Sequence, residues 1–200
     1  MSKIARGVIA LTAWFALVLQ LVIMLPKATS IVTGLVNFFS YFTILTNLLV
    51  ALCFSSQWFP PRSSLRRFFS KPAVKAGITM YITVVGIIYS LLLRKIWNPT
   101  GWQLVADRLL HDVVPILTVL YWLIVEPKGE LKWKHAFWWL IYPAVYLLLT
   151  LLRGVYPYPF IDYNKLGLQQ TATNITLMTV GFLMLGLLYV TLDRLMGRRS

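Results

Sequence analysis

The chain has 200 residues, of which 58% are apolar and only 12% charged, with a mean hydropathy of +0.72. This composition excludes an ordinary soluble globular domain and indicates that lipid is the chain's solvent. A formal net charge of +13 would suggest nucleic acid as the partner of a soluble protein. Here the basic residues lie between apolar segments, where they orient membrane spans, so we expect no nucleic-acid partner.

Six apolar segments are each long enough to cross about 30 Å of hydrocarbon as a helix. In chain order they cover residues 7–25, 31–55, 76–93, 103–125, 135–152 and 172–192. Unpaired backbone amides are too costly in hydrocarbon, and the two-residue alternation of a membrane barrel is absent. The sequence therefore predicts an all-α fold in which residues 1–200 form one domain, a bundle of six transmembrane helices.

The basic residues predict the orientation of this bundle. Thirteen of the 19 Lys and Arg residues lie before the first span, after the second, fourth and sixth spans, and so on one side. By the positive-inside rule this side is cytoplasmic, and both termini are expected there. The loop after the second span is the most basic, and four of its residues are expected to contact anionic lipid headgroups: Arg62, Arg66, Arg67 and Lys71.

Polar side chains inside the spans are the candidates for function, because burying them in lipid is costly. At about 100° per residue, five of them share one face of the second span: Thr33, Asn37, Ser40, Thr43 and Asn47. A face of the fourth span carries Asp107, Arg108, His111, Pro115 and Thr118, with Asp112 beside it, and Asn174 belongs to a shorter polar patch on the sixth. The alternative reading is that these groups are interhelical hydrogen bonds, as is common in membrane bundles.

His111 is the strongest candidate for chemistry, because imidazole is the usual proton carrier near neutral pH. At 1.5 Å per residue, Thr43 is expected about 18 Å and His111 about 12 Å below the outer face, so the two could meet in the outer half. Asp107 or Asp112 could orient the imidazole, and the helical spacing favours Asp107.

The segment after the fifth span, residues 153–162, is expected to cover the outer mouth of the bundle, because its two prolines disfavour a helix. It contributes Tyr156 and Tyr158, and Arg153 could meet a carboxylate or a headgroup there. The other histidine, His135, is predicted on the cytoplasmic side. A haem held by two axial histidines is therefore not expected, because His111 and His135 lie at different depths. With one cysteine, Cys53, we expect neither a metal site nor a cofactor.

Three short strings carry a resemblance to a known family: residues 41–47 (Tyr-Phe-Thr-Ile-Leu-Thr-Asn), 110–115 (Leu-His-Asp-Val-Val-Pro) and 156–162 (Tyr-Pro-Tyr-Pro-Phe-Ile-Asp). They resemble the androgen-induced and androgen-dependent six-span membrane hydrolases, most of all the prokaryotic members. The resemblance implies a threonine nucleophile, Thr43, and a histidine base, His111, acting on fatty acid esters of hydroxy fatty acids. It also implies the inner membrane of a bacterium. Asp112 departs from the animal members, and Thr46 competes with Thr43 as nucleophile.

Two functions from different classes follow. In the first, the chain is an intramembrane lipid ester hydrolase whose partners are membrane lipids and the ester substrate, with His111 activating the hydroxyl of Thr43. Asn47, one turn from Thr43, would then donate to the oxyanion or serve only to hold helices together. In the second, the same polar groups line the site of a noncatalytic carrier or binding protein for a lipid or small molecule.

Overall fold

Residues 2–197 are described in the computed structural model, and within this range the chain forms helices and loops without any β-strand. The all-α prediction is therefore confirmed for the described residues. The chain divides into two compact units, Met1–Pro127 (unit 1) and Lys128–Ser200 (unit 2), and each is described by itself.

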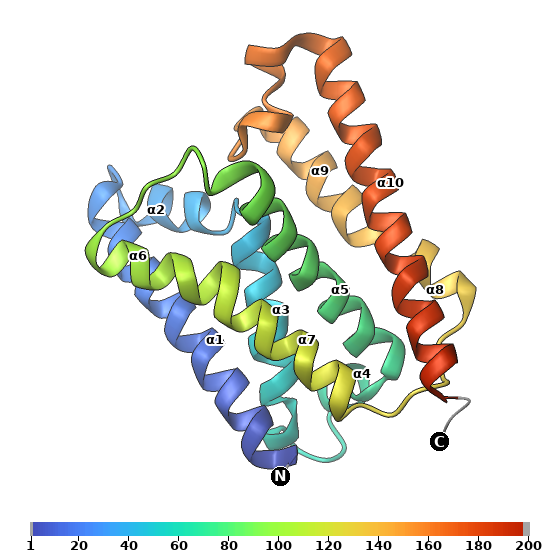
Figure 1. Cartoon of the computed structure of the whole chain (residues 1–200). Helices are drawn as coiled ribbons and strands as arrows, with labels where there is room; N and C mark the ends of the chain where they lie inside the picture. The colour runs from blue at the N-terminus through green and yellow to red at the C-terminus, as the bar shows by residue number, and fades with distance from the viewer. Residues whose placement is uncertain (1, 198–200) are drawn as a thin grey trace. The chain divides into compact units, whose positions relative to one another are not determined.

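Unit 1 contains seven α-helices among its described residues. They are α1 (Ser2–Met24), α2 (Ile31–Phe38), α3 (Phe42–Ser55), α4 (Ser64–Ser70), α5 (Pro72–Ile88), α6 (Gly101–Arg108) and α7 (Val114–Ile124). Two π-helical turns are continuous with these helices: η3 (Tyr89–Leu93) extends α5, and η4 (Leu109–Val113) joins α6 to α7. In unit 1, α3 packs between α1 and α5, and α7 contacts both α5 and α1 (Figure 1).

The packing of α1 shows how lipid acts as the solvent. Its buried face carries small residues, among them Ala13 and Ala16, which let α3 approach closely. Its other faces expose large apolar residues such as Leu11 and Val22. Large apolar side chains outside and small ones inside are the pattern expected of a helix surrounded by lipid tails.

The second predicted span is not one straight helix. The axes of α2 and α3 are bent by 80° at residues 39–41, where the amides of Ser40 and Tyr41 bond to the carbonyls three residues before them and end α2. The expectation of a single polar stripe along residues 33–47 is therefore wrong, because Thr43 belongs to the first turn of a new helix. The estimated depth of about 18 Å for Thr43 assumed a straight helix and fails for the same reason.

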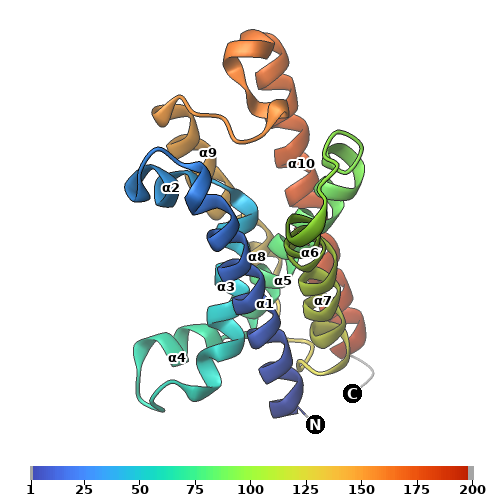
Figure 2. The same ribbon diagram turned by 90° about the vertical axis from the view of Figure 1, so that its left-hand side faces the viewer.

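The fourth predicted span forms one uninterrupted helical run, residues 101–124, made of α6, η4 and α7. It carries Asp107, Arg108 and Asp112 near its middle, so it is less apolar than the other long helices. Both views show the start of α1, the short helix α4 and the end of α7 at one end of unit 1, with α2 at the opposite end (Figures 1 and 2). We call the former the basic end, because Arg6, Arg66 and Lys75 lie there.

Unit 2 consists of α8 (Trp133–Trp138), α9 (Ile141–Arg153), the short 3-10 turn η5 (Pro159–Ile161) and α10 (Tyr163–Gly197). The left-handed residue Gly154, with φ +66°, ends α9. The buried carboxylate of Asp193 on α10 accepts a hydrogen bond of 2.8 Å from the backbone amide of Leu131 before α8. Gly186 lets α10 approach α8 closely, since a Cβ on Gly186 would lie only 3.3 Å from the Cβ of Ala136.

Four helical segments of the described chain are long and apolar enough to cross a membrane: Lys3–Lys27, Pro72–Leu93, Trp133–Arg153 and Tyr163–Gly197. The bent pair α2 and α3 would make a fifth. These segments support an integral membrane protein of packed helices. The number of six spans and the cytoplasmic position of both termini stay predictions.

Candidate functional site

His111 lies in the π-helical turn η4, where Asp107 and Tyr89 hold its ring. Its Nδ1 is 2.9 Å from the backbone oxygen of Asp107 and 3.3 Å from the carboxylate Oδ1 of the same residue. The ring stacks on Tyr89 with a centroid distance of 4.0 Å and an angle of 15°. The hydroxyl of Tyr89 donates to the other carboxylate oxygen of Asp107, which is buried. One carboxylate therefore fixes both rings.

The hydrogen bonding of the His111 imidazole decides which of its nitrogens can accept a proton. Because both acceptors of Asp107 lie beside Nδ1, the neutral ring of His111 carries its proton there. Nε2 is then the unprotonated nitrogen, the form that a general base requires.

Two π-helical turns meet at this site. Tyr89 begins η3, and His111 is the middle residue of η4. A π-turn widens the helix by one residue, and such turns are frequent at functional sites. Gly86, one turn before Tyr89, packs against η4, and a Cβ on it would lie at contact distance, 3.4 Å, from the backbone oxygen of His111.

The buried amide of Asn47 supplies a hydrogen bond in η4 that Pro115 cannot donate. In the π-register the amide of Val114 bonds to the carbonyl of Leu109, so the next bond would join residue 115 to the carbonyl of Leu110. Pro115 has no N–H to donate. Asn47 Nδ2 takes its place, 3.2 Å from the oxygen of Leu110, and also lies 2.9 Å from the oxygen of Thr43.

This arrangement favours the structural reading of Asn47 over the oxyanion donor that the sequence also allowed. Its amide nitrogen is engaged by the carbonyls of Thr43 and Leu110. The atom of Asn47 without a hydrogen-bond partner among the described residues is Oδ1, which is an acceptor. An oxyanion needs a donor, so Asn47 in this conformation does not supply one.

Thr43 and Thr46 are both buried on α3. The side chain of Asn47 links the backbone of Thr43 to that of Leu110, the residue before His111. One amide therefore ties the turn that carries Thr43 to the turn that carries His111. This link joins backbone atoms, and the choice between Thr43 and Thr46 as nucleophile stays a prediction.

Asp112 belongs to a separate ion-pair group at the edge of the site. Its carboxylate accepts from Arg94, and from Arg108 at 2.9 Å. The guanidinium of Arg94 also lies 5.0 Å from the centre of the Tyr89 ring. The sequence favoured Asp107 over Asp112 as the partner of His111, and the distances agree with that choice.

Four further predicted site residues lie in unit 2. Asn174 donates to the backbone oxygen of Phe160 at 2.8 Å and accepts from Gln170 at 2.9 Å. Tyr158 is buried and stacks on Phe160, while Tyr156 lies in the same loop and Arg153 ends α9. These contacts account for Asn174 and Tyr158 as structural residues of unit 2, and the contribution of all four to the site stays a prediction.

Sequence reasoning missed Tyr89 and Arg94, although both contact the group around His111. The third span shows no polar stripe, so nothing in its pattern singled out a tyrosine near its end. Within residues 2–197, no group of three or more His, Cys, Asp or Glu side chains is arranged to hold a metal ion.

No family model matches this chain, and no curated protein or solved structure matches it.

Proposed function

We propose that the chain is an intramembrane lipid ester hydrolase in which Thr43 is the nucleophile and His111 its base. The observation that supports this most is the fixed imidazole: Asp107 engages Nδ1 and leaves Nε2 as the proton acceptor. A buried carboxylate behind an imidazole is the arrangement that hydrolases of unrelated folds use to orient the base.

The reaction proceeds in two transfers. The hydroxyl oxygen of Thr43 attacks the ester carbonyl while Nε2 of His111 takes its proton, and the carboxylate of Asp107 stabilises the imidazolium. His111 then returns the proton to the alcohol oxygen as the ester C–O bond breaks, leaving an acyl ester on Thr43. Water attacks this ester in the same way, which releases the fatty acid and restores the threonine.

The substrate class rests on the resemblance and on the setting. The resemblance implies fatty acid esters of hydroxy fatty acids, which are apolar enough to lie among the helices. Lipid-facing side chains surround the helices that carry the site, so an ester with long acyl chains would reach it from the bilayer.

The test is hydrolysis of a panel of long-chain lipid esters by the purified protein, with Thr43→Ala, Thr46→Ala and His111→Ala compared. We expect Thr43→Ala and His111→Ala to lose turnover and Thr46→Ala to keep it. Matched controls are Thr150→Ala, another buried threonine, and His135→Ala, the other histidine. Undiminished turnover in both Thr43→Ala and His111→Ala would end the proposal.

The noncatalytic carrier is the second candidate, and the 80° bend between α2 and α3 favours it. Interrupted helices at membrane depth commonly form substrate sites in transporters. A carrier would bind the lipid ester without consuming it. Retention of an intact ester by the purified protein, together with an unmodified Thr43 after incubation, would favour the carrier.

A further inference from the structure

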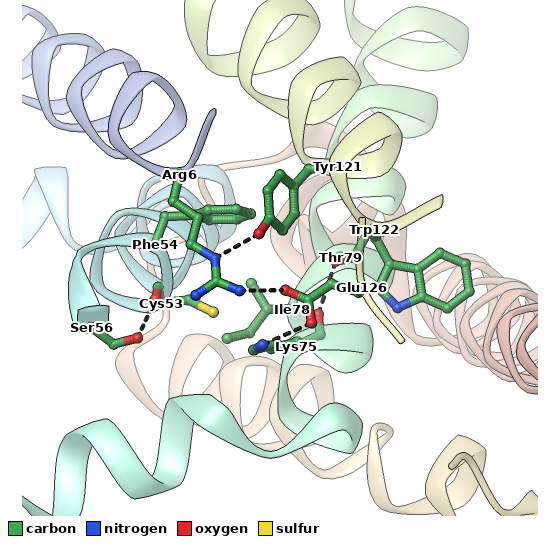
Figure 3. Close-up of a pocket in the computed structure, with 10 residues that line it drawn as sticks. All are labelled: Arg6, Cys53, Phe54, Ser56, Lys75, Ile78, Thr79, Tyr121, Trp122 and Glu126. Carbon is green, nitrogen blue, oxygen red and sulfur yellow. Dashed lines mark hydrogen bonds and ion pairs between the residues drawn. The ribbon is translucent and has the colours of Figure 1, made fainter. Parts of the chain in front are cut away.

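A second polar group lies at the basic end of unit 1, away from His111. Arg6 of α1 and Lys75 of α5 converge there on Glu126, which follows α7, and Arg6 also donates to Tyr121 of α7 (Figure 3). Tyr121 is ten residues beyond His111, which corresponds to about 15 Å along a helix. The group is therefore separate from the proposed hydrolase site.

These side chains line a hollow of about 30 Å³, together with Cys53, Ser56 and Thr79. A hollow of this size holds about two water molecules or one inserted polar group. The side chains of Arg6 and Lys75 are 34% and 22% exposed, so the hollow can be reached from outside, whereas that of Glu126 is only 9% exposed. The cations therefore form the mouth and the carboxylate lies within.

Positive charge exceeds negative charge in this group. Lys75 donates to Glu126 at 2.7 Å, and Nε of Arg6 donates to the hydroxyl of Tyr121 at 2.6 Å. The guanidinium of Arg6 approaches Glu126 only to 3.7 Å, too far for a hydrogen bond. Two cations face one carboxylate, so the group has a net charge of +1.

The surface beside the hollow has the character of a membrane interface. The short helix α4 contacts α5 and the turn Ser56–Trp58, and both of these segments line the hollow or border it. Its neighbourhood exposes Leu65, Phe68 and Trp58 among basic side chains. Apolar and aromatic residues mixed with arginine are typical of segments that lie at lipid headgroups.

We infer that this hollow is a phosphate-binding site in which Arg6 and Lys75 donate to the phosphate oxygens of an anionic ligand. Guanidinium and ammonium groups are the usual partners of phosphate, and basic pockets between membrane helices bind lipid headgroups. Phosphate could come from a phospholipid headgroup or from a free phosphate ion. The apolar and basic surface of α4 favours the lipid.

In this site Glu126 acts against the ligand. Its carboxylate holds Arg6 and Lys75 in place but also repels an approaching phosphate. Glu126→Gln removes that repulsion and raises the charge of the group from +1 to +2. A site for phosphate therefore predicts tighter binding in Glu126→Gln, whereas a merely structural ion pair predicts no gain.

The experiment measures ligand-induced shifts in the melting temperature of the purified full-length protein, titrated with phosphatidylglycerol, phosphatidylcholine or inorganic phosphate. We expect phosphatidylglycerol to stabilise the protein most. Binding should weaken about tenfold in Arg6→Gln and in Lys75→Gln and should tighten several-fold in Glu126→Gln. Lys95→Gln, which removes one exposed lysine of unit 1 that does not line the hollow, is the matched control and should change binding little.

Equal weakening in Arg6→Gln and Lys95→Gln would overturn the site, because the effect would then be general surface charge. So would weaker or unchanged binding in Glu126→Gln. If inorganic phosphate stabilises the protein as well as the lipid does, with the same order among the variants, the phosphate site stands and the rest of the lipid adds nothing to its recognition. Hydrolysis by these variants is not part of the test, because the phosphate site is separate from the proposed hydrolase site.

Discussion

At the scale of single residues, Asn47 and Pro115 depend on each other. Pro115 leaves the carbonyl of Leu110 without a helical donor, and the buried amide of Asn47 supplies one. In lipid such a carbonyl cannot turn to water, so the pair solves a problem that is severe in a membrane and mild in a soluble protein. The same amide connects the turns that carry Thr43 and His111.

Asn47→Leu should destabilise the protein by about 1–3 kcal/mol, because it leaves the carbonyl of Leu110 buried and unpaired. Pro115→Ala restores an N–H at the position that the π-register assigns to that carbonyl. The double variant should therefore lose about 1 kcal/mol less than the sum of the two single variants. Thermal unfolding in detergent measures all four proteins, and strictly additive losses would show that Asn47 does not replace the proline's missing donor.

Asp107 and Asp112 give a matched test of the site, since both are carboxylates of one helical run but only Asp107 contacts His111. Asp107→Asn should lower kcat for ester hydrolysis by two orders of magnitude or more, because the imidazole loses its orientation and its counter-charge. Asp112→Asn should leave kcat close to the wild-type value. Steady-state kinetics on one ester decide this, and a larger loss in Asp112→Asn contradicts the assignment.

Part of this residue-level picture was predictable. Helical spacing alone pointed to Asp107, because residues four apart share a face and adjacent residues do not. The role of Asn47 was not predictable, because it depends on a π-turn that shifts the hydrogen-bond register by one residue. Tyr89 escaped notice because a lone tyrosine near a span end also suits a membrane interface.

At the scale of elements, the bend between α2 and α3 changes how the chain enters the membrane. Hydropathy shows one apolar segment over residues 31–55, and only the backbone turn at 39–41 divides it. A straight helix and a broken one have the same composition, so hydropathy cannot separate them. Val32 of α2 and Phe39 directly after it are exposed apolar residues, and in a bilayer we expect both near one surface.

We predict that Val32→Cys and Phe39→Cys, each spin-labelled in a Cys53→Ser background, report nearly equal depths in the bilayer. The reason is that α2 lies at 80° to α3 and so runs nearly along the membrane plane when α3 crosses it. In a straight span the two labels would differ by about 10 Å along the membrane normal. Paramagnetic depth measurements distinguish the two cases, and a difference near the larger value would contradict the bend.

At the scale of the whole molecule, composition and charge predicted the helical membrane character, and the structure confirms its all-helical part. Large apolar side chains are exposed in both units, as in Leu11 and Leu152, and polar groups such as Asn47 and Asp193 are buried beside apolar ones. The count of six spans stays a prediction for two reasons. The run 101–124 carries three charged residues in its middle, and α2 does not continue into α3.

The six-span prediction has a direct consequence for topology. Alkaline phosphatase fused after Asn98 or after Tyr158 should be active, because both loops are predicted outside, and fusions after Pro61, after Gly129 or at the C-terminus should be inactive. Green fluorescent protein at the same five positions is the control, since it should fluoresce only where the phosphatase is inactive. An active phosphatase at the C-terminus would contradict its predicted cytoplasmic position.

Hydrolysis by this protein requires that His111 make the hydroxyl of Thr43 nucleophilic. A long-chain fluorophosphonate, incubated with the purified protein and followed by peptide mass spectrometry, tests it most directly. The account predicts a phosphonyl adduct on Thr43 that disappears in His111→Ala and persists in His135→Ala. An adduct on Thr46 instead, or labelling of Thr43 that is unaffected by His111→Ala, would contradict it.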